Sequence, residues 1–425
     1  MKRVCVVGGG PAGLAAAYAA AKNENEVFLI EKNEKLGKKI YITGKGRCNF
    51  TNDSLPEDFL TNVVRGERFL KGCIYAYSPR DIMDFFEEYG LSIKVERGNR
   101  VFPSSDHASD VTKTLEKACK TVGVQVFLNE TVENISTMRD IIPMSDIDST
   151  QNKDNMPRVV SVETSKRTIE CDVCIVATGG LSYPTTGSTG DGYKFAKSNG
   201  HSVVELRPAL CGFELEGELY KNLQGLSLKN VVLTVKNGEK LIFNELGEAL
   251  FTHFGISGPL VLTASSLVNR LQVKNLQVYL DFKPALDEQT LDKRLLRDFE
   301  KFKNKKISNA LSELLPQKLI FAVLSVAKIP ESKNVNVLTK QERGELLRVL
   351  KSFPLQIKAL RGFNEAIVTS GGVDLSQINP KTMESKLVRG LKFCGETLDV
   401  DAFTGGFNMQ IAFSTGFAAG YTIKD

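Results

Sequence analysis

The chain has 425 residues, of which 42% are hydrophobic and 25% are charged. This composition excludes a disordered chain, a collagen-like fibre and a coiled coil, and the length predicts two to three domains at roughly 150 residues each. The 55 Lys and Arg residues exceed the 50 Asp and Glu residues only slightly. That balance suits an anionic small ligand and does not indicate a nucleic-acid-binding protein.

Eight cysteines are spread along the chain without the spacing of a disulfide framework. In a chain long enough to build its own core they are expected to be reduced thiols, which predicts a cytoplasmic protein. No run approaches the ~18 apolar residues of a membrane span, and Gly and Pro interrupt the apolar N-terminal stretch, which argues against a signal peptide. The three histidines lack the spacing of a metal site, so no metal is expected.

The first elements predict the opening of a doubly wound α/β sheet. Residues 3–7 are expected to form a buried strand, which a Gly-rich turn joins to an Ala-rich helix at 13–22 and a second strand at 26–31. A polar stretch at 137–157 is expected to be an irregular excursion. Two further helices and four strands are predicted at 78–90 and 108–122, and at 124–128, 131–136, 158–163 and 172–177.

The sequence pattern changes after residue 194. Period-two alternation predicts an antiparallel barrel or sandwich, with strands at 203–206, 210–216, 228–236, 240–244 and 276–282. Residues 286–352 switch to helical periodicity, strands return at 354–360 and 364–369, and 391–425 read as a strand, a Gly-rich turn and a small-residue helix. We therefore predict three parts: an α/β domain at 1–193 and 373–425, an inserted β-barrel-like domain at 194–283 and 355–372, and a small helical insert at 284–354.

The turn at residues 8–13 (GGGPAG) contains G-x-G-x-x-G after a strand and at the start of a helix. Gly8 permits the tight turn, Gly10 lets the backbone approach a pyrophosphate, and Gly13 lets the helix pack on the strand. The N-terminus of the helix favours an anion. Glu31 ends the second strand, where a carboxylate can accept hydrogen bonds from ribose hydroxyls. Together these features predict a dinucleotide site without separating FAD from NAD.

Other glycine clusters bear on which dinucleotide is bound. One follows the strand at 172–177, and two more, at 395–399 and 405–409, precede the final helix. If both ends of the chain build one site, the ligand is long. No second strand–GxGxxG–helix unit is present in the sequence, so a second, stably bound nicotinamide domain is not expected.

Several segments resemble one flavoprotein family. The chain is similar to FAD-containing oxidoreductases of the glutathione-reductase-type fold, and more narrowly to the family that includes aminoacetone oxidase and a bile-acid 7-dehydroxylation reductase. The resemblance implies a Rossmann-like FAD domain interrupted by a barrel-like insert and a small helical insert. It is carried by GGGPAG (8–13), GKKIYITGKGRCNFTN (37–52), FPSSDHASDV (102–111), ATGGLSYPTTGSTGDGY (177–193), FTHFGISGPLVL (251–262) and the segment from SGGV to FAAG (370–420).

The resemblance also implies positions for the cofactor. Glu31 would hold the adenosine ribose, Val132 would contact the adenine through its backbone, and Lys39, Thr43 and the loop 44–49 would approach the flavin. Gly395, Glu396 and Asp399 would lie on the ribityl-phosphate side, and the helix beginning near Asn408 would point its N-terminus at the N1/C2=O edge, where reduction places negative charge. The expected cofactor-binding residues are Gly8, Gly10, Pro11, Ala12, Gly13, Glu31, Lys32, Lys39, Thr43, Gly44, Gly46, Arg47, Cys48, Asn49, Val132, Ala177, Thr178, Gly179, Gly180, Gly395, Glu396, Asp399, Gly406, Phe407, Asn408 and Met409.

No catalytic acid or base is assigned; Asn49, Tyr183 and His253 are candidates, the last two with a structural role as the alternative. Arg47 is expected to contact the cofactor or an acidic substrate, or to be a phosphate-facing loop residue, whereas Cys48 is expected to be a buried small residue.

Three other features have structural interpretations. Asp191 is expected to cap a helix at 192–199. Residues 171 and 174, a C-x-x-C pair, are expected to pack in the core, because positions i and i+3 of a strand face opposite sides. The basic run at 301–306 is expected to be a solvated helix end.

The sequence predicts an FAD-dependent oxidoreductase that moves hydride through flavin N5 to or from a small organic substrate, with O2 or transient NAD(P)H as the second redox partner. A flavin-dependent RNA-modifying or nucleic-acid-binding protein and a non-catalytic flavin-bound regulator are the alternatives. Nucleic acid is disfavoured because Glu288, Asp292, Asp298 and Glu300 dilute the basic charge of 286–352. No membrane partner is expected, and the oligomeric state is not predicted.

Overall fold

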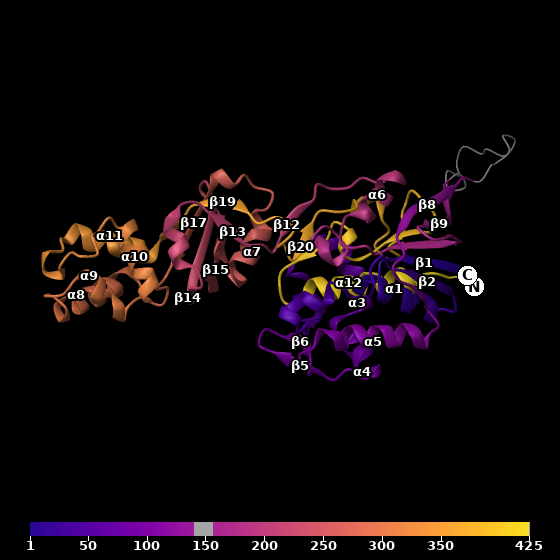
Figure 1. The fold of residues 1–425 in the computed structure, drawn as a ribbon, viewed down its shortest axis with the longest axis horizontal. Coiled ribbons are helices and arrows are strands. Elements are labelled where there is room, and N and C mark those ends of the chain that lie inside the picture. Colours follow the sequence, from indigo (N-terminus) through magenta and orange to yellow (C-terminus); the bar gives the residue numbers. More distant parts are fainter. Residues whose placement is uncertain (140–155, 425) are drawn as a thin grey trace. The chain divides into compact units, whose positions relative to one another are not determined.

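A computed structural model describes residues 1–139 and 156–424 of the chain (Figure 1). The chain divides into two compact units: unit 1 comprises Met1–Arg207 and Ile367–Asp425, and unit 2 comprises Pro208–Ala366. Of the excursion expected at 137–157, residues 140–155 lie outside the described residues. Within the described parts of the chain, no helix is both long enough and apolar enough to cross a membrane.

The centre of unit 1 is a five-stranded parallel sheet of order β21-β11-β1-β2-β7. The strand order turns at β1, which has β2 on one side and β11 on the other, and in such sheets ligands bind at the carboxyl ends of the strands beside this point. The doubly wound α/β prediction is confirmed. The strands are β1 (Arg3–Val7), β2 (Glu26–Ile30), β7 (Gln125–Phe127), β11 (Val173–Val176) and β21 (Leu391–Phe393).

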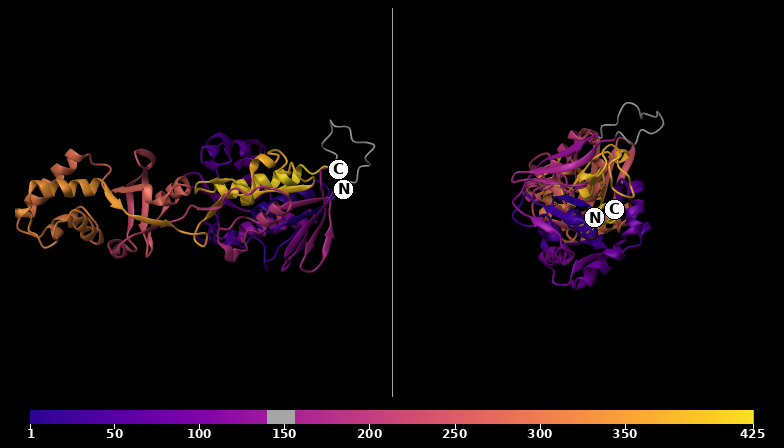
Figure 2. Two further views of the ribbon diagram at one scale, coloured as in Figure 1. Left: turned by 90° about the horizontal axis from the view of Figure 1, so that it is seen from above. Right: turned by 90° about the vertical axis from the view of Figure 1, so that its right-hand side faces the viewer.

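Two helices from opposite ends of the chain pack closely in unit 1. These are α1 (Pro11–Lys22) and α12 (Phe407–Tyr421) (Figure 1). Gly416 and Gly420 of α12 leave no room for a side chain, because a Cβ atom at either would overlap a carbonyl oxygen of α1. The small residues of both helices therefore allow the backbones to approach, and the two chain termini lie near each other (Figure 2).

Smaller elements surround this core. The helix α3 lies in a stretch where no element was predicted. The strand expected at 203–206 is wrong, because Val203 forms an isolated β-bridge with Val373 there and no strand is present at these described residues. The helices are α2 (Pro56–Leu60), α3 (Glu67–Ala76), α4 (Pro79–Glu88), α5 (Ala108–Thr121) and α6 (Asp191–Ser198); the strands are β3 (Thr51–Asn52), β4 (Val63–Arg65), β5 (Ile93–Glu96), β6 (Arg100–Pro103), β8 (Val132–Met138), β9 (Arg158–Thr164), β10 (Thr168–Glu170) and β22 (Asp401–Ala402).

Unit 2 contains a seven-stranded antiparallel sheet of order β18-β17-β14-β15-β16-β13-β19. Its two edge strands are consecutive in the sequence and only Gln356 separates them, so the sheet must curl until its edges are within about 7 Å. This explains the barrel-like form that the alternating pattern predicts. The strands are β13 (Phe213–Leu215), β14 (Ser227–Asn237), β15 (Lys240–Phe251), β16 (Gly255–Ser257), β17 (Leu276–Asp281), β18 (Phe353–Leu355) and β19 (Ile357–Leu360).

The helices of unit 2 share one hydrophobic core with these strands, so their separation as a third domain stays a prediction. Unit 1 extends to Arg207, since Phe195 of α6 belongs to its core and Val203 and Leu206 pack against that core. Two short strands, β12 (Arg207–Ala209) and β20 (Val368–Ser370), lie where the chain leaves unit 1 and returns to it. The helices of unit 2 are α7 (Pro259–Val268), α8 (Glu288–Lys301), α9 (Ile307–Ala310), α10 (Gln317–Val326) and α11 (Lys340–Lys351).

Candidate functional site

A pocket in unit 1 lies at the carboxyl ends of β1, β2 and β11. Its space not filled by protein atoms, including the open solvent at its mouth, is about 1310 Å³. Segments from both ends of the chain line it, as the glycine clusters predict. The lining residues come from 7–12, 30–33, 38–43, 130–132, 177–179, 186–191, 195, 367–368, 396, 400 and 408–412.

The glycine-rich turn has the geometry that its sequence predicts. Gly8 has a φ of +105°, and a Cβ there would lie 2.6 Å from the carbonyl oxygen of Ala177. A Cβ at Gly13 would overlap the carbonyl oxygen of Gly8, so only glycine lets α1 pack on this turn. A Cβ at Gly10 would meet no atom within 4 Å, although Gly10 lines the pocket. The turn therefore leaves a cradle before the N-terminus of α1, where amides without helical acceptors favour an anion.

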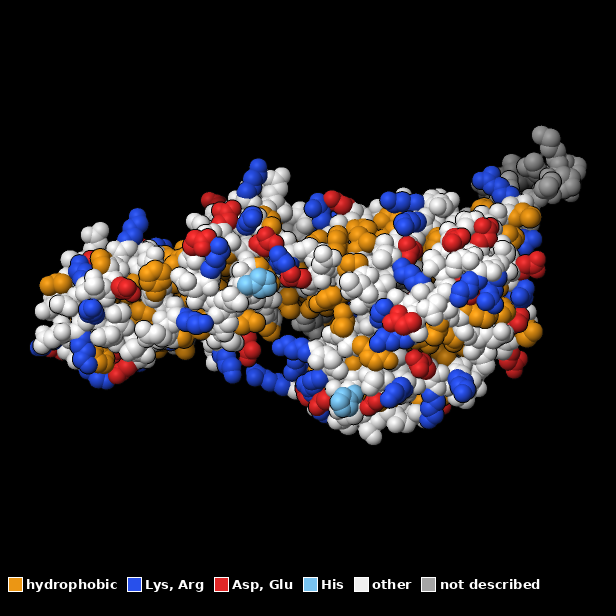
Figure 3. Space-filling view, viewed as in Figure 1, with side chains coloured by type: hydrophobic (Ala, Val, Ile, Leu, Met, Phe, Trp, Pro, Cys, Tyr) orange, Lys and Arg blue, Asp and Glu red, His pale blue; other side chains and the backbone are white. Residues whose placement is uncertain are grey.

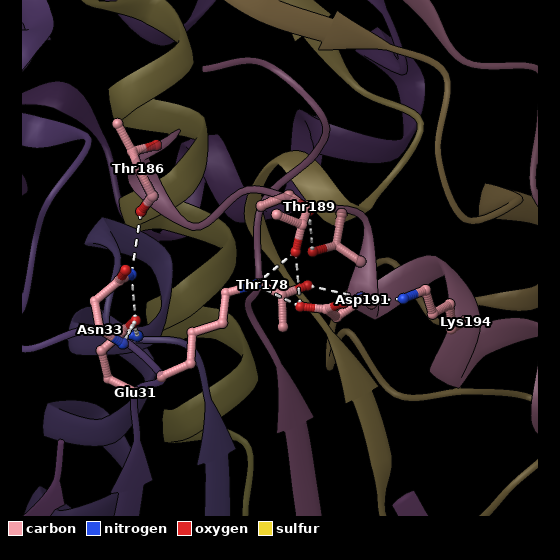
Figure 4. Close-up of polar contacts among 12 residues, drawn as sticks. Glu31, Asn33, Thr178, Thr186, Thr189, Asp191 and Lys194 are labelled. Atoms are coloured by element: carbon pink, nitrogen blue, oxygen red, sulfur yellow. Dashed lines mark hydrogen bonds and ion pairs between the residues drawn. The ribbon is translucent and has the colours of Figure 1, made fainter. Parts of the chain in front are cut away.

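Glu31 lines the pocket and is mostly buried, and Figure 4 shows its side chain beside Asn33. Its carboxylate accepts hydrogen bonds from the backbone N–H of Gly9 at 2.7 Å and from the backbone N–H and side-chain amide of Asn33 at 2.8 and 2.6 Å. These bonds fix the carboxylate beside the glycine-rich turn. Val132 also lines the pocket, and the role of Glu31 and Val132 toward an adenosine stays a prediction.

Residues 186–191, which we call the strap, form hydrogen bonds and an ion pair with Lys32 and Asn33, which follow β2 (Figure 4). The Lys32 ammonium lies 2.6 Å from a carboxylate oxygen of Asp191 and donates to the hydroxyl of Thr189 at 2.5 Å. The Asn33 amide donates to the carbonyl oxygen of Thr186 at 3.2 Å. The strap therefore closes one side of the pocket beside Glu31.

The expectation that Asp191 caps α6 is wrong. Gly190 is the N-cap residue of α6, no side chain caps this end, and Asp191 is the first helical residue. Burial alone would raise the pKa of Asp191, but the Lys32 ammonium, with Thr189, holds it below its usual value. Asp191 is thus an ionised partner of Lys32.

Lys39 and Glu396 also line the pocket, and the Lys39 ammonium lies 2.7 Å from a carboxylate oxygen of Glu396. Both also contact Ser182, because Lys39 donates to its hydroxyl and this hydroxyl donates to Glu396 at 2.6 Å. The backbone N–H of Thr369 donates to Glu396 at 2.7 Å. Of the other residues expected near the flavin, Thr43, Asn408 and Met409 line the pocket.

The loop with Arg47, Cys48 and Asn49 does not line the pocket. The Arg47 guanidinium forms ion pairs with Glu96 and Asp106, and it stacks at 4.3 Å from the Phe102 ring centre. Its charge is therefore used within the protein, and a cofactor contact by Arg47 gains no support from the geometry. Burial raises the pKa of Cys48 to about 12, so this residue is a thiol. The side-chain oxygen of Asn49 is buried without a hydrogen-bond partner among the described residues.

Other expected cofactor residues also lie outside the lining. Asp399 is buried and held by Arg65 in a two-bond ion pair. The Asn408 side chain contacts the backbone of Ala402 through bonds of 3.0 and 2.7 Å, which fixes the start of α12. The residues expected at the cofactor that line no part of this pocket are Gly13, Gly44, Gly46, Arg47, Cys48, Asn49, Gly180, Gly395, Asp399, Gly406 and Phe407.

None of the three catalytic candidates lines the pocket. Tyr183 has a left-handed backbone (φ 51°) before the short turn Pro184–Thr186. His253 is exposed on unit 2, with its ring 5.1 Å from that of Phe254. Among the described residues, no group of three His, Cys, Asp or Glu side chains is placed to hold a metal ion.

Several lining residues were not predicted. Among them are Asn33, Lys38, Thr186, Gly187 and Ser188 of the strap, Ile367, Val368, Ile411 and Ala412. The strap lies in the segment ATGGLSYPTTGSTGDGY (177–193), whose glycines were the available signal. The apolar residues gave no signal, because an aliphatic side chain that lines a pocket has the same sequence pattern as one in the core.

Three comparisons place the chain among known proteins. The family described as the HI0933-like protein Rossmann domain matches residues 2–422. A 3-dehydro-bile acid delta(4,6)-reductase of Clostridium scindens is 29% identical over 99% of this chain and 98% of its own length. Ribosomal RNA dihydrouridine synthases of Escherichia coli and Haemophilus influenzae are each 30% identical, over 97% and 99% of this chain and 96% and 98% of their own lengths.

Solved structures show the same fold at low sequence identity. A 3-ketosteroid delta1-dehydrogenase of Sterolibacterium denitrificans has a TM-score of 0.53 at 13% identity, over 99% of this chain and 98% of that chain. A 3-ketosteroid-delta4-(5alpha)-dehydrogenase of Rhodococcus jostii has a TM-score of 0.52 at 14% identity, over 99% and 96%. With the family match over nearly its whole length, this chain belongs to the HI0933-like family of flavoprotein oxidoreductases and has their FAD-binding, Rossmann-type α/β fold.

Proposed function

We propose that this protein binds FAD in the pocket of unit 1 and uses it to reduce a carbon–carbon double bond. The single observation that carries the proposal is the pocket itself, which runs from the Gly10 cradle to the start of α12 and has oppositely charged side chains along it. A long, anionic dinucleotide fits this lining: the open cradle suits its pyrophosphate and Glu31 its ribose. When bound, FAD supplies a hydride acceptor and donor at N5.

The names of the full-length relatives support reduction of a conjugated double bond. One relative is named for the reduction of Δ4 and Δ6 bonds of a 3-dehydro bile acid, and two are named for making dihydrouridine. Both products arise when hydride and a proton add across a C=C bond that a carbonyl group polarises. The shared chemistry therefore favours this reaction for the present chain, with a small organic enone as substrate and NAD(P)H as the electron source.

The test is a two-step reduction under anaerobic conditions. The purified protein is expected to carry FAD, released and identified after denaturation. NADH or NADPH should then bleach the flavin absorption band, and a 3-keto-4-ene steroid should restore it, with the saturated product identified by mass spectrometry. Bleaching followed only by peroxide formation in air would assign an oxidase instead. A flavin that no nicotinamide or substrate reduces or reoxidises would favour the non-catalytic regulator.

A second candidate, reduction of uridine in RNA, rests on the charge of unit 2. Unit 2 has 23 Lys and Arg residues against 17 Asp and Glu residues, so it holds the positive excess of the whole chain. Figure 3 shows basic side chains on the visible face of α8 to α11 with acidic ones interspersed. The rRNA-related names leave the expectation against nucleic acid open. Salt-sensitive binding of ribosomal RNA, and dihydrouridine formed in it, would select this candidate.

The cytoplasmic location stays a proposal. The observation that supports it is that all eight cysteines are free and buried, as expected of a protein in a reducing compartment. A tagged full-length protein that partitions with cytosolic markers on fractionation would support the location, and recovery with an exported marker would contradict it.

A further inference from the structure

The Lys39–Glu396 ion pair places two opposite charges on the pocket wall. The resemblance implies the flavin near Lys39 and the ribityl-phosphate side of the cofactor near Glu396. The charged atoms lie 2.7 Å apart, and the side chains of Lys39 and Glu396 are only 22% and 19% exposed. A pair this sheltered interacts more strongly with its surroundings than a surface pair does.

The structure holds the Glu396 carboxylate in place from three directions. Lys39, the Ser182 hydroxyl and the backbone N–H of Thr369 all donate to it, at 2.7, 2.6 and 2.7 Å for Lys39, Ser182 and Thr369. Burial alone would raise the pKa of Glu396, but the Lys39 charge and these hydrogen bonds hold it below its usual value. Glu396 is therefore ionised at neutral pH.

The Lys39 ammonium is fixed by the same group of atoms. Its hydrogen bonds to Ser182 and Glu396 use two of its three N–H donors, which leaves one for a ligand in the pocket. The Ser182 side chain that links the two charges is fully buried. The ammonium and the carboxylate thus keep fixed positions on the pocket wall.

We propose that Lys39 and Glu396 together set the reduction potential of the bound flavin, Lys39 raising it and Glu396 lowering it. The proposal deepens the proposed function and rests on FAD occupying this pocket. Two-electron reduction makes the flavin more negative, so a nearby ammonium stabilises the reduced form and a nearby carboxylate destabilises it. Neither residue is assigned a proton transfer; Glu396 also acts as a positioning residue for Lys39.

The test measures the ratio of reduced to oxidised flavin in equilibrium with a reference dye at fixed pH. Lys39→Met is expected to lower this ratio about tenfold at a given dye potential, and Glu396→Gln to raise it by a similar factor. The side-chain oxygen of glutamine can still accept from Ser182 and Thr369, while its NH2 group replaces the oxygen that accepts from Lys39. Glu396→Gln therefore removes the charge together with the hydrogen bond from Lys39. The double variant is expected to return close to the wild-type ratio, because the two changes oppose each other.

Two controls separate charge from structure. Lys39→Arg retains the charge and should stay within about twofold of wild type, a change that corresponds to less than half a kcal/mol. Lys113→Met makes the same chemical change at an exposed position of α5, outside the pocket, and should leave the ratio unchanged. If Lys39→Met does not retain FAD, Glu396→Gln and Lys39→Arg still test the sign and the charge dependence.

The outcomes distinguish this proposal from the proposed function. A wild-type protein that neither carries nor takes up FAD overturns the proposed function, and the present proposal with it. FAD binding with ratios that stay within twofold of wild type in both charge-removing variants, or that move in the same direction, overturns this proposal alone. Opposite shifts that cancel in the double variant are the supporting result.

Discussion

Lys32 and Asp191 are 159 residues apart in the chain, yet their charged atoms lie 2.6 Å apart across one side of the pocket. Their side chains are 26% and 22% exposed, so the pair is partly shielded from salt. Because the strap must move for a ligand to leave on this side, we expect the pair to slow cofactor release.

Asp191→Asn is therefore expected to speed FAD dissociation about fivefold, since a partly exposed ion pair contributes about 1 kcal/mol. Release can be followed by the rise in flavin fluorescence after dilution. The matched control is Lys194→Met, because Lys194 is 3.4 Å from Asp191 but largely exposed and does not contact Lys32. High salt should speed release from the wild type more than from Asp191→Asn. If the wild type and Asp191→Asn released FAD at equal rates, the strap would have no role in holding the cofactor.

Two glycines of the same turn are expected to respond in opposite ways to alanine. At Gly10 a Cβ meets no protein atom, so Gly10→Ala should fold with an unchanged melting temperature. The added methyl group enters the cradle and is expected to clash with the bound cofactor. A steric cost of about 1–3 kcal/mol would lower the affinity for FAD by about tenfold. At Gly13 the Cβ overlaps the Gly8 carbonyl, so Gly13→Ala should lower the melting temperature of the apoprotein itself. Thermal unfolding and FAD titration of both variants separate the effect on stability from the effect on FAD affinity. Normal FAD binding by Gly10→Ala would contradict the cradle as the cofactor site.

Glu31→Ala is expected to lower FAD affinity by about 1.5–3 kcal/mol, the range for hydrogen bonds to a charged group. The same change leaves the Gly9 N–H without its acceptor, which should also lower the melting temperature. Glu31→Gln retains one acceptor oxygen and the side-chain volume, so it should keep more of the thermal stability while still weakening FAD. Isothermal titration and thermal unfolding separate the two effects. Full FAD retention in Glu31→Ala would rule out the ribose role.

The start of α11 predicts a pH-dependent stability in unit 2. Glu342 forms a capping box with Thr339 and an ion pair with Lys333, and these contacts lower the pKa of Glu342 to about 2. A carboxyl group with a depressed folded pKa contributes above its unfolded value and loses that contribution as pH falls toward 2. The cap is expected to contribute about 1 kcal/mol at pH 7.

Chemical unfolding followed by circular dichroism at pH 7 and pH 3 measures this effect. Glu342→Gln should be less stable than wild type at pH 7 and should approach it at pH 3. Glu345→Gln removes a half-buried carboxylate that pairs with Arg348 on the same helix and does not touch the cap, so its effect should be smaller. A Glu342→Gln deficit that persists unchanged at pH 3 would contradict the ionic contribution.

The sequence by itself determined the α/β core and the phosphate-binding turn of this protein. Strand β1, the turn and α1 are adjacent in the chain, and the close packing of Gly13 on the carbonyl oxygen of Gly8 lies within this one segment. The alternating strands of unit 2 and the helical periodicity of 286–352 were likewise predictable, because each depends on burial along a single element.

The partners of the charged side chains were decided only by the tertiary structure. Arg47 and Asp399 are expected at the cofactor, and that role stays a prediction. In the structure Arg47 stacks on Phe102, Asp399 pairs with Arg65, and neither lines the pocket. Asp191 was expected to cap a helix and instead pairs with Lys32. Long, charged side chains reach several positions from one backbone site, and the choice depends on which distant loops the fold brings together. That choice leaves no recognisable pattern in the sequence, whereas the glycine-rich turn is marked by its G-x-G-x-x-G motif.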